Sequence, residues 1–405
     1  MNILWVNWKD WRHPGAGGAE VVLHELIKRQ VADGHNVTLL TALYKDAKPI
    51  EQCEGLTIIR VPGNRYIQPF TTARHYRKHL RGQHDVIIEA VNTAPYFMPY
   101  LTSHRWCGLS PRKRLAARKR PPATDTTVCR WCSKTIAQPL VLYHQLARQV
   151  WFHELPPPFG LLGYALIEPA STFLMAKSGT PTIAMSNSTK QDLKRFGFRE
   201  QQLHIISEGI ESEPLRSLDG ITKYEQPTLF AHGAMRAMKR TLHQIQAFEL
   251  AKPHIPDLRI MVSGNHNGPY GKKVLDYIAA SPYAADIHVL GRTTTQKRDE
   301  LMQRSHLHLQ TAAKEGWGIT VTEANASGTP CVVYDTDGLR DSVRNGETGI
   351  ITASNPQSMA NAIVQLLQDQ DAYEKLRQNA WRWSHDITFD QSYRDLLAVL
   401  RHITQ

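Results

Sequence analysis

The stretch EGWGITVTEANASGTP, residues 315–330, places a glycine-rich turn directly before a helix that carries a second carboxylate, Glu323. A helix start is a natural anion site, because its amides lack partners and its dipole favours negative charge. We expect the amides of Gly318, Ile319 and Thr320 to point at a diphosphate. Glu323, one turn later, is placed to accept hydrogen bonds from two sugar hydroxyls. The same spacing also fits a capping box from Thr320 to Glu323, which would only stabilise the helix.

Strands and helices alternate on both sides of this stretch. The short apolar runs LRIMVSG, IHVLGR and HLHLQTA precede it, and TPCVVY follows it. Residues 1–43 form the same pattern, with strand ILWVNW, glycine loop PGAGGAE, a helix from Val21 to Ala32 and strand HNVTLLTAL. This alternation is typical of parallel sheets covered by helices. We therefore predict an α/β chain of two Rossmann-like, doubly wound parallel-sheet domains that face each other across a cleft.

The length and composition agree with two globular domains. The chain has 405 residues, of which 41% are hydrophobic and 21% are charged. It contains no run of eighteen consecutive apolar residues, and its N-terminus resembles a buried strand rather than a signal peptide. Five cysteines, an odd number, argue against a disulfide framework. We expect a cytoplasmic protein without a membrane-spanning helix.

One basic segment, residues 103–138, interrupts the alternation and is predicted to be an inserted loop. Nine basic residues and one acidic residue lie between Ser103 and Lys134, within a chain of net charge +11. The segment also has the spacing of a weak zinc candidate, although the alternative is a loosely packed basic loop. The four candidate zinc ligands are His104, Cys107, Cys129 and Cys132.

The spacing of Glu315 and Glu323 within EGWG and EANASGTPCVV closely resembles family 4 of the retaining glycosyltransferases, also called glycosyl transferase group 1. The resemblance extends to GAGGAEVVLHEL, SNSTKQDLKRFG and LGR, and to ISEGI, where the family usually has asparagine-glycine-isoleucine. It implies the GT-B architecture. Residues 1–210 would bind the acceptor, residues 211–384 would bind the nucleotide sugar, and residues 385–405 would form a helix crossing back to the first domain.

The resemblance also implies roles for individual residues. Glu323 would hold the nucleotide ribose, and Glu315 would contact the donor sugar near its reacting carbon. His144, which ends the strand LVLY, would lie beside the donor sugar, although a lone histidine is more often structural. Lys239 would neutralise the departing diphosphate. The implied catalytic residues are Glu315, His144 and Lys239, and the implied donor-binding residues are Gly233, Arg236, Gly316, Gly318, Ile319, Thr320 and Glu323.

The segment GAMRAMKR, residues 233–240, departs from the family pattern at one position. Ala234 stands where the family has an arginine. Arg236 or Arg240 would have to replace it, or stabilisation of the leaving group would lose one cation. The sequence leaves this choice open.

The N-terminal loop supplies the remaining candidates. Gly17 and Gly18 resemble the glycine pair at which substrate approaches the backbone in this family. They form the expected acceptor and phosphate loop. Glu20 occupies the third glycine position of a dinucleotide fingerprint, which disfavours NAD.

The resemblance implies transfer of a hexose from a nucleoside diphosphate sugar to a glycan or lipid-linked acceptor, with retention at the anomeric carbon, as in polysaccharide biosynthesis. The nucleotide sugar is a co-substrate, and no metal or other cofactor is expected. An epimerase-like protein or a phosphorylase is a weaker alternative.

Two further alternatives concern the basic insert. A catalytically impaired homologue could use it to bind nucleic acid, with Trp106 and Trp131 stacking on bases, although nucleic acid is the less favoured partner. The insert and the apolar run PPPFGLLGYALIEPA could instead contact an anionic membrane peripherally, at the inner face of the cell membrane.

Overall fold

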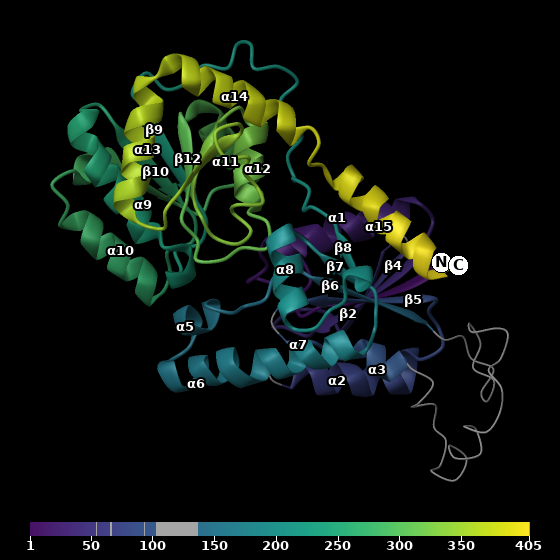
Figure 1. Cartoon of the computed structure of the whole chain (residues 1–405). Coiled ribbons are helices and arrows are strands. Elements are labelled where there is room, and N and C mark those ends of the chain that lie inside the picture. Colours follow the sequence, from purple (N-terminus) through teal and green to yellow (C-terminus); the bar gives the residue numbers. More distant parts are fainter. Residues whose placement is uncertain (54, 65–66, 93, 103–136, 405) are drawn as a thin grey trace, which may run out of the picture.

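The computed structural model describes residues 1–53, 55–64, 67–92, 94–102 and 137–404 (Figure 1). Residues 103–136 of the predicted insert, with its zinc candidates His104, Cys107, Cys129 and Cys132, lie outside the described residues. Its predicted end at residue 138 is wrong, because Gln138 already belongs to a strand of the first sheet. The remaining chain forms two mostly parallel, helix-covered sheets, which confirms the predicted fold class.

The N-terminal domain is built on an eight-stranded sheet of order β3-β4-β2-β1-β5-β6-β7-β8. All its pairs are parallel except β3 with β4, which is antiparallel at the edge. The central strand β5 is buried along its whole length, as expected for a strand covered on both faces. The strands are β1 Asn2–Val6, β2 Asn36–Ala42, β3 Ile50–Cys53, β4 Leu56–Val61, β5 Val86–Val91, β6 Gln138–Tyr143, β7 Thr182–Ala184 and β8 Leu203–Ile205.

Helices cover both faces of this sheet. One face carries α1 and the C-terminal helix α15, and the other carries α2, α3 and α7 (Figure 1). The helical segments of this domain are α1 Gly18–Ala32, α2 Gln68–His75, η1 Tyr76–Leu80, α3 Met98–Thr102, α5 Val150–Glu154, α6 Pro157–Leu162, η3 Gly163–Ile167, α7 Glu168–Lys177, α8 Asn187–Arg195 and η4 Glu200–Gln202.

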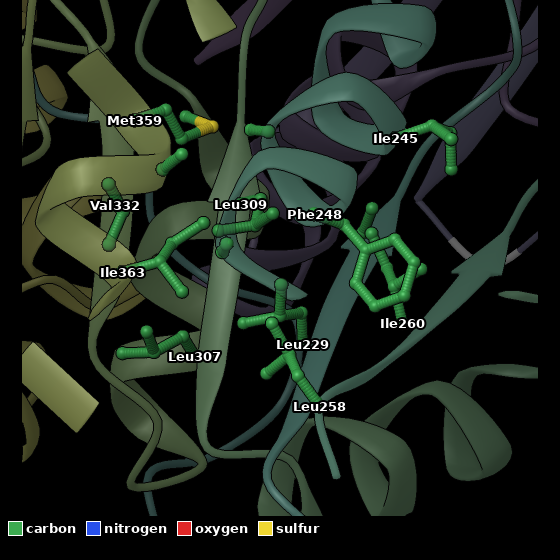
Figure 2. Packing of buried hydrophobic residues seen from close by; sticks show 14 of the residues in the cluster. Leu229, Ile245, Phe248, Leu258, Ile260, Leu307, Leu309, Val332, Met359 and Ile363 are labelled. Atoms are coloured by element: carbon green, nitrogen blue, oxygen red, sulfur yellow. The ribbon is translucent and has the colours of Figure 1, made fainter. Parts of the chain in front are cut away.

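The C-terminal domain has a six-stranded, fully parallel sheet of order β11-β10-β9-β12-β13-β14. Its core lies between this sheet and the helices α9 and α13, where Phe248 and Ile363 pack on Leu229 and Leu309 (Figure 2). The strands are β9 Thr228–His232, β10 Arg259–Ser263, β11 Ile287–Gly291, β12 Leu307–Gln310, β13 Cys331–Tyr334 and β14 Gly349–Thr352. The helices are η5 Ala237–Lys239, α9 Thr241–Ala251, η6 Lys252–His254, α10 Pro269–Ala279, η7 Ala284–Asp286, α11 Thr295–Arg304, α12 Ile319–Ala326, α13 Pro356–Gln368 and α14 Gln370–Ser384.

The last helix, α15 Phe389–Thr404, lies on the N-terminal domain. Phe389, Tyr393 and Leu396 belong to the same buried cluster as α1 and strand β1. The Tyr393 hydroxyl also donates to Asp33 at the end of α1 (2.8 Å). The chain therefore finishes beside the domain in which it began, and its two termini lie close together (Figure 1).

Residues 150–177 are almost entirely helical, which the sequence analysis did not predict. Pro157 opens α6, where a proline costs no intrahelical hydrogen bond. By length and composition the helix Pro157–Lys177 could cross a membrane, and 33% of its apolar window is buried. A search for eighteen consecutive apolar residues does not detect this helix, because proline, glycine, serine, threonine and the charged Glu168 interrupt its apolar residues.

Lys223 anchors the segment that enters the C-terminal domain. Its side-chain nitrogen is buried and lies within hydrogen-bond distance of three carbonyl oxygens and one hydroxyl, and none of these acceptors is a carboxylate. These acceptors are Gln303 O (2.9 Å), Ser305 O (2.8 Å), Gly328 O (2.9 Å) and Thr329 Oγ1 (2.8 Å). The lysine thus ties together the ends of α11 and α12, the second of which carries Glu323.

We expect Lys223→Met to lower the free energy of unfolding by about 3 kcal/mol, because it leaves several buried acceptors without a donor. Chemical denaturation of the full chain measures the loss. Lys273→Met, at an exposed position of α10, is the matched control and should change stability by less than about 0.5 kcal/mol. Equal effects of the two substitutions would contradict the role assigned to Lys223.

Candidate active site

The candidate residues lie where the carboxyl ends of the two sheets meet. His144 follows β6 of the N-terminal domain, and the turn at Gly316 follows β12 of the C-terminal domain. The two backbones are in direct contact, since a Cβ on Gly316 would lie 2.7 Å from the His144 carbonyl oxygen. Gly18 lies against the side chain of Ile319, whose Cδ1 would be 3.1 Å from a Cβ on Gly18. Residues predicted from three separate motifs are therefore brought to one place.

A buried lysine joins the domains beside this contact. Lys314 Nζ lies 2.6 Å from Asp192 Oδ2 of α8 and 2.6 Å from Asp337 Oδ2 of the C-terminal domain. Lys314 is only 2% exposed to solvent. Burial alone would raise the pKa of Asp337. The hydrogen bond and charge of Lys314, together with Arg340, outweigh this effect, so the pKa is lowered and the carboxylate stays ionised. The sequence analysis did not identify this triad, although Lys314 directly precedes the EGWG turn.

Helix α12 begins as the anion-site prediction requires. Gly318 is its N-cap, has a φ of +96° and provides no side-chain cap. The amides of Ile319 and Thr320 therefore open the helix without intrahelical partners. Thr320 Oγ1 accepts a hydrogen bond from Gln310 Nε2 (2.6 Å) instead of capping the helix. The alternative of a capping box between Thr320 and Glu323 is thus wrong.

Glu323 is buried on α12 and pairs with an arginine that the sequence analysis missed. Arg298 Nη1 lies 2.9 Å from Glu323 Oε1, and Arg298 also contacts Asp299 and Ser212. Burial raises the pKa of Glu323 to about 7, although the charge of Arg298 lowers it. Arg298 therefore fixes the position of the Glu323 carboxylate, and this group gains or loses its proton near neutral pH.

Lys239 and Glu315 form an ion pair between the two C-terminal motifs. The loops that carry them are tied together, since Thr311 Oγ1 donates to Lys239 O (2.8 Å) and Ala313 N donates to Met238 O (2.7 Å). Both side chains remain partly accessible, with 26% and 15% exposed. Gly233 begins the same loop with a φ of +147°, and its carbonyl packs against Gly264.

The two arginines that could replace the missing one differ in their surroundings. Arg236 Nη2 lies 2.8 Å from Glu154 Oε1 of α5, an exposed ion pair between the domains. Arg240 has a left-handed backbone with φ +51°, and no carboxylate pairs with it in the part of the chain that the structure describes. Its positive charge contributes to lowering the pKa of His153, after burial. Arg236 is thus paired with a carboxylate, whereas Arg240 has no carboxylate partner among the described residues.

His144 is positioned by a carboxylate that also escaped the sequence analysis. Its Nδ1 lies 3.0 Å from Glu208 Oε1, and both side chains are 7% exposed. Glu208 is the residue of ISEGI that replaces the asparagine of the family pattern, which was the available signal. A proton on Nδ1 shared with Glu208 leaves Nε2 to meet a substrate.

The N-terminal loop closes on itself beside His144. The Gly17 amide donates to Glu20 Oε2 (2.7 Å), and Gly18 begins α1. Burial raises the pKa of Glu20, against the opposing effects of the Gly17 amide, Lys9 and His144. Glu20 therefore fixes the conformation of the loop at Gly17 and Gly18 through its hydrogen bond to the Gly17 amide.

Among the described residues, no group of three or more His, Cys, Asp or Glu side chains could hold a metal ion. The cations and helix amides around Glu315 are the positive groups that the site itself supplies. Cys331 is buried in β13, where burial raises the pKa of its thiol, and Cys53 is exposed.

Two family models match the chain. The family described as glycosyl transferases group 1 matches residues 220–383, and glycosyltransferase family 4 matches residues 16–213. Among curated proteins, the poly(glycerol-phosphate) alpha-glucosyltransferase of Bacillus subtilis is 28% identical over 150 residues, 36% of this chain and 22% of that protein. The putative glycosyltransferase EpsD of the same species is 27% identical over 214 residues, 49% of this chain and 55% of that protein. The chain thus spans less than two thirds of the length of these relatives.

Solved structures match over the whole chain. Sucrose-phosphate synthase from Thermosynechococcus elongatus superposes with a TM-score of 0.72 at 15% identity, covering 100% of this chain and 99% of that one. Anabaena HepE in complex with UDP-glucose gives a TM-score of 0.67 at 15% identity, covering 99% and 100%. These likenesses show a shared fold. Together with the two family models, they place the chain among the GT-B glycosyltransferases of group 1 and family 4, to which it belongs.

Proposed function

We propose that this glycosyltransferase moves a hexose from a nucleoside diphosphate sugar to a glycan or lipid-linked acceptor, with retention of configuration and without a metal ion. The observation that carries the proposal is the Lys239–Glu315 pair, which lies beside the open start of α12. A diphosphate is the ligand that matches a lysine and free helix amides. The HepE complexes with UDP and UDP-glucose support a nucleotide-sugar donor on this fold.

The donor is proposed to lie along the C-terminal edge of the second sheet. Its ribose hydroxyls would donate to Glu323, and its diphosphate would face the amides of Ile319 and Thr320. Gly316 and Gly318 leave room for the phosphates to approach the backbone. The hexose would then reach Glu315 and His144.

In the proposed reaction, the bond between the anomeric carbon and the diphosphate oxygen breaks, and negative charge develops on the diphosphate. Lys239 and the amides of α12 stabilise that charge. The acceptor hydroxyl attacks the same face of the sugar, and its proton passes to the departing phosphate. Glu315 holds a sugar hydroxyl, and Glu208 keeps His144 Nε2 directed toward the sugar.

A second cation is proposed to complete the leaving-group site. Arg236 would have to leave Glu154, but exposed ion pairs contribute little stability and separate readily. Arg240 is free of a carboxylate within the described chain and needs no such exchange. We therefore assign the larger role to Arg240, and Arg236 remains a donor-binding candidate through movement of its loop.

The experiment that tests this function is a thermal-shift panel of GDP-mannose, UDP-glucose, UDP-N-acetylglucosamine and their free nucleotides. One nucleotide series should stabilise the chain selectively. Glu323→Ala should lower the affinity for that nucleotide by at least about tenfold, because two hydrogen bonds to a charged group are lost. Glu347→Ala, at an exposed position, is the matched control and should bind as wild type does. Stabilisation by none of the compounds would contradict the proposal.

The pKa of Glu323 predicts a pH dependence of nucleotide binding. Its ionised form accepts two hydroxyl hydrogen bonds, and that form predominates only above about pH 7. Affinity should therefore rise, by up to about tenfold, between about pH 6 and about pH 8. Titration calorimetry at both pH values measures the change, and Glu323→Gln should remove the slope. A slope that persists in this variant would show that another group titrates.

A further inference from the structure

The outer surface of α5, α6, η3 and α7 is unusually apolar. Fifteen large hydrophobic side chains are exposed in the described part of the chain, and eight of them lie within residues 152–174. Each of the eight is between 45% and 63% exposed. Monomeric soluble domains rarely expose so continuous an apolar surface without a partner. The eight residues, which we call the apolar ridge, are Phe152, Phe159, Leu161, Leu162, Leu166, Ile167, Phe173 and Leu174.

The ridge is one face of a helix whose opposite face is fixed to the domain. Gly160, Gly163, Glu168, Thr172 and Met175 are buried, at helical spacing interrupted by the π-helical turn η3. The first two of these positions pack on Trp151 of α5, and the exposed side chains between the five positions point to solvent. Within residues 156–176, all of which the structure describes, Glu168 is the one charged residue, and it is buried.

Glu168 excludes a membrane-spanning role for this helix in the folded chain. Its carboxylate accepts from the amides of Ala147 (2.5 Å) and Arg148 (2.8 Å) and from Trp151 Nε1 (3.2 Å). Insertion across a bilayer would pull these groups apart and leave a carboxylate in hydrocarbon. The helix is instead suited to lie in the plane of an interface, with its inner face held by the protein.

Basic residues flank the ridge on the same side of the sheet. Tyr76 and Leu80 of η1 pack with α3, and the α3 residue Tyr100 donates from its hydroxyl to Leu174 O of α7 (2.5 Å). The three segments thus share one face, as Figure 1 shows. Residues 55–84 contain no Asp or Glu, whereas Arg74, Arg77 and Lys78 are exposed there. Phe70 on α2 and Ile67, which directly precedes this helix, are also exposed.

We propose that this face docks onto an anionic lipid bilayer. Apolar side chains that enter the interface and flanking basic residues that meet anionic headgroups are the two features that hold a helix on such a surface. A second copy of the chain would bring its own basic flank toward this one, and like charges would repel.

The docking face is connected to the active site. Val150 at the start of α5 packs with Met238, and Glu154 at its end pairs with Arg236. Docking would thus bring the site to the bilayer surface, where a lipid-linked acceptor is presented. This last step rests on the proposed function, but docking itself does not.

The test is vesicle flotation of the full chain with phosphatidylcholine alone or with an equimolar mixture of phosphatidylcholine and phosphatidylglycerol. Wild type should float with the mixed vesicles and far less with phosphatidylcholine alone. The triple variant Phe159→Ser, Leu162→Ser, Leu166→Ser should lose at least about tenfold in vesicle affinity. Its matched control replaces three exposed apolar residues elsewhere, Ile205→Ser, Leu250→Ser and Leu290→Ser, and should float as wild type does.

The basic flank is tested separately. Arg74→Glu with Lys78→Glu should weaken binding severalfold, whereas Lys272→Glu with Lys273→Glu on α10 should leave it unchanged. Nucleotide-induced thermal shifts, measured on every variant, separate a failure of docking from misfolding or from a failure of the proposed function.

Three results would overturn docking. Wild type could fail to float with mixed vesicles, or the ridge triple could float as well as wild type. Alternatively, light scattering could show a dimer that the ridge triple dissociates, in which case a second copy covers the ridge.

Discussion

The arrangement of the site depends on the ion pairs that Lys314 forms with both domains. Its ammonium lies between Asp192 of the first domain and Asp337 of the second, with almost no access to water. Replacement of Lys314 by an apolar residue would leave Asp192, which is 7% exposed, without its buried cation, and such a change is costly. The triad therefore holds the carboxyl ends of both sheets together. The contacts of Gly316 with His144 and of Gly18 with Ile319 lie next to this bridge, since Lys314 is two residues before Gly316.

The α/β architecture could be predicted because its signals are local. Residues 1–43 alternate between apolar strands and an amphipathic helix, and they form β1, α1 and β2 as expected. The helix from Pro157 to Lys177 could not be predicted in this way, because it is apolar on both its buried and exposed faces and so lacks a helical hydrophobic period. The short strand β3, with the sequence IEQC, likewise has no alternation that would predict an antiparallel edge.

The site was predictable where a motif is continuous along the chain. The turn before α12 and the neighbouring Lys239 and Glu315 follow from sequence and resemblance. Their partners do not, because Arg298, Glu208 and Asp192 come from distant segments and meet the site only in the folded chain. Arg298 is the clearest example, since it is an ordinary polar residue of α11 in sequence but pairs with Glu323 in the structure. Such pairings depend on tertiary packing.

We propose that this site breaks the bond between the sugar and the diphosphate of a nucleotide sugar with retention, using its own cations. Proton NMR of donor hydrolysis in the presence of EDTA tests this claim most directly, because the first anomer released can be identified before it equilibrates. We expect release of the sugar in the configuration it had in the donor, with turnover strongly reduced in Lys239→Met. Release of the opposite anomer, or turnover that requires an added divalent ion, would contradict it.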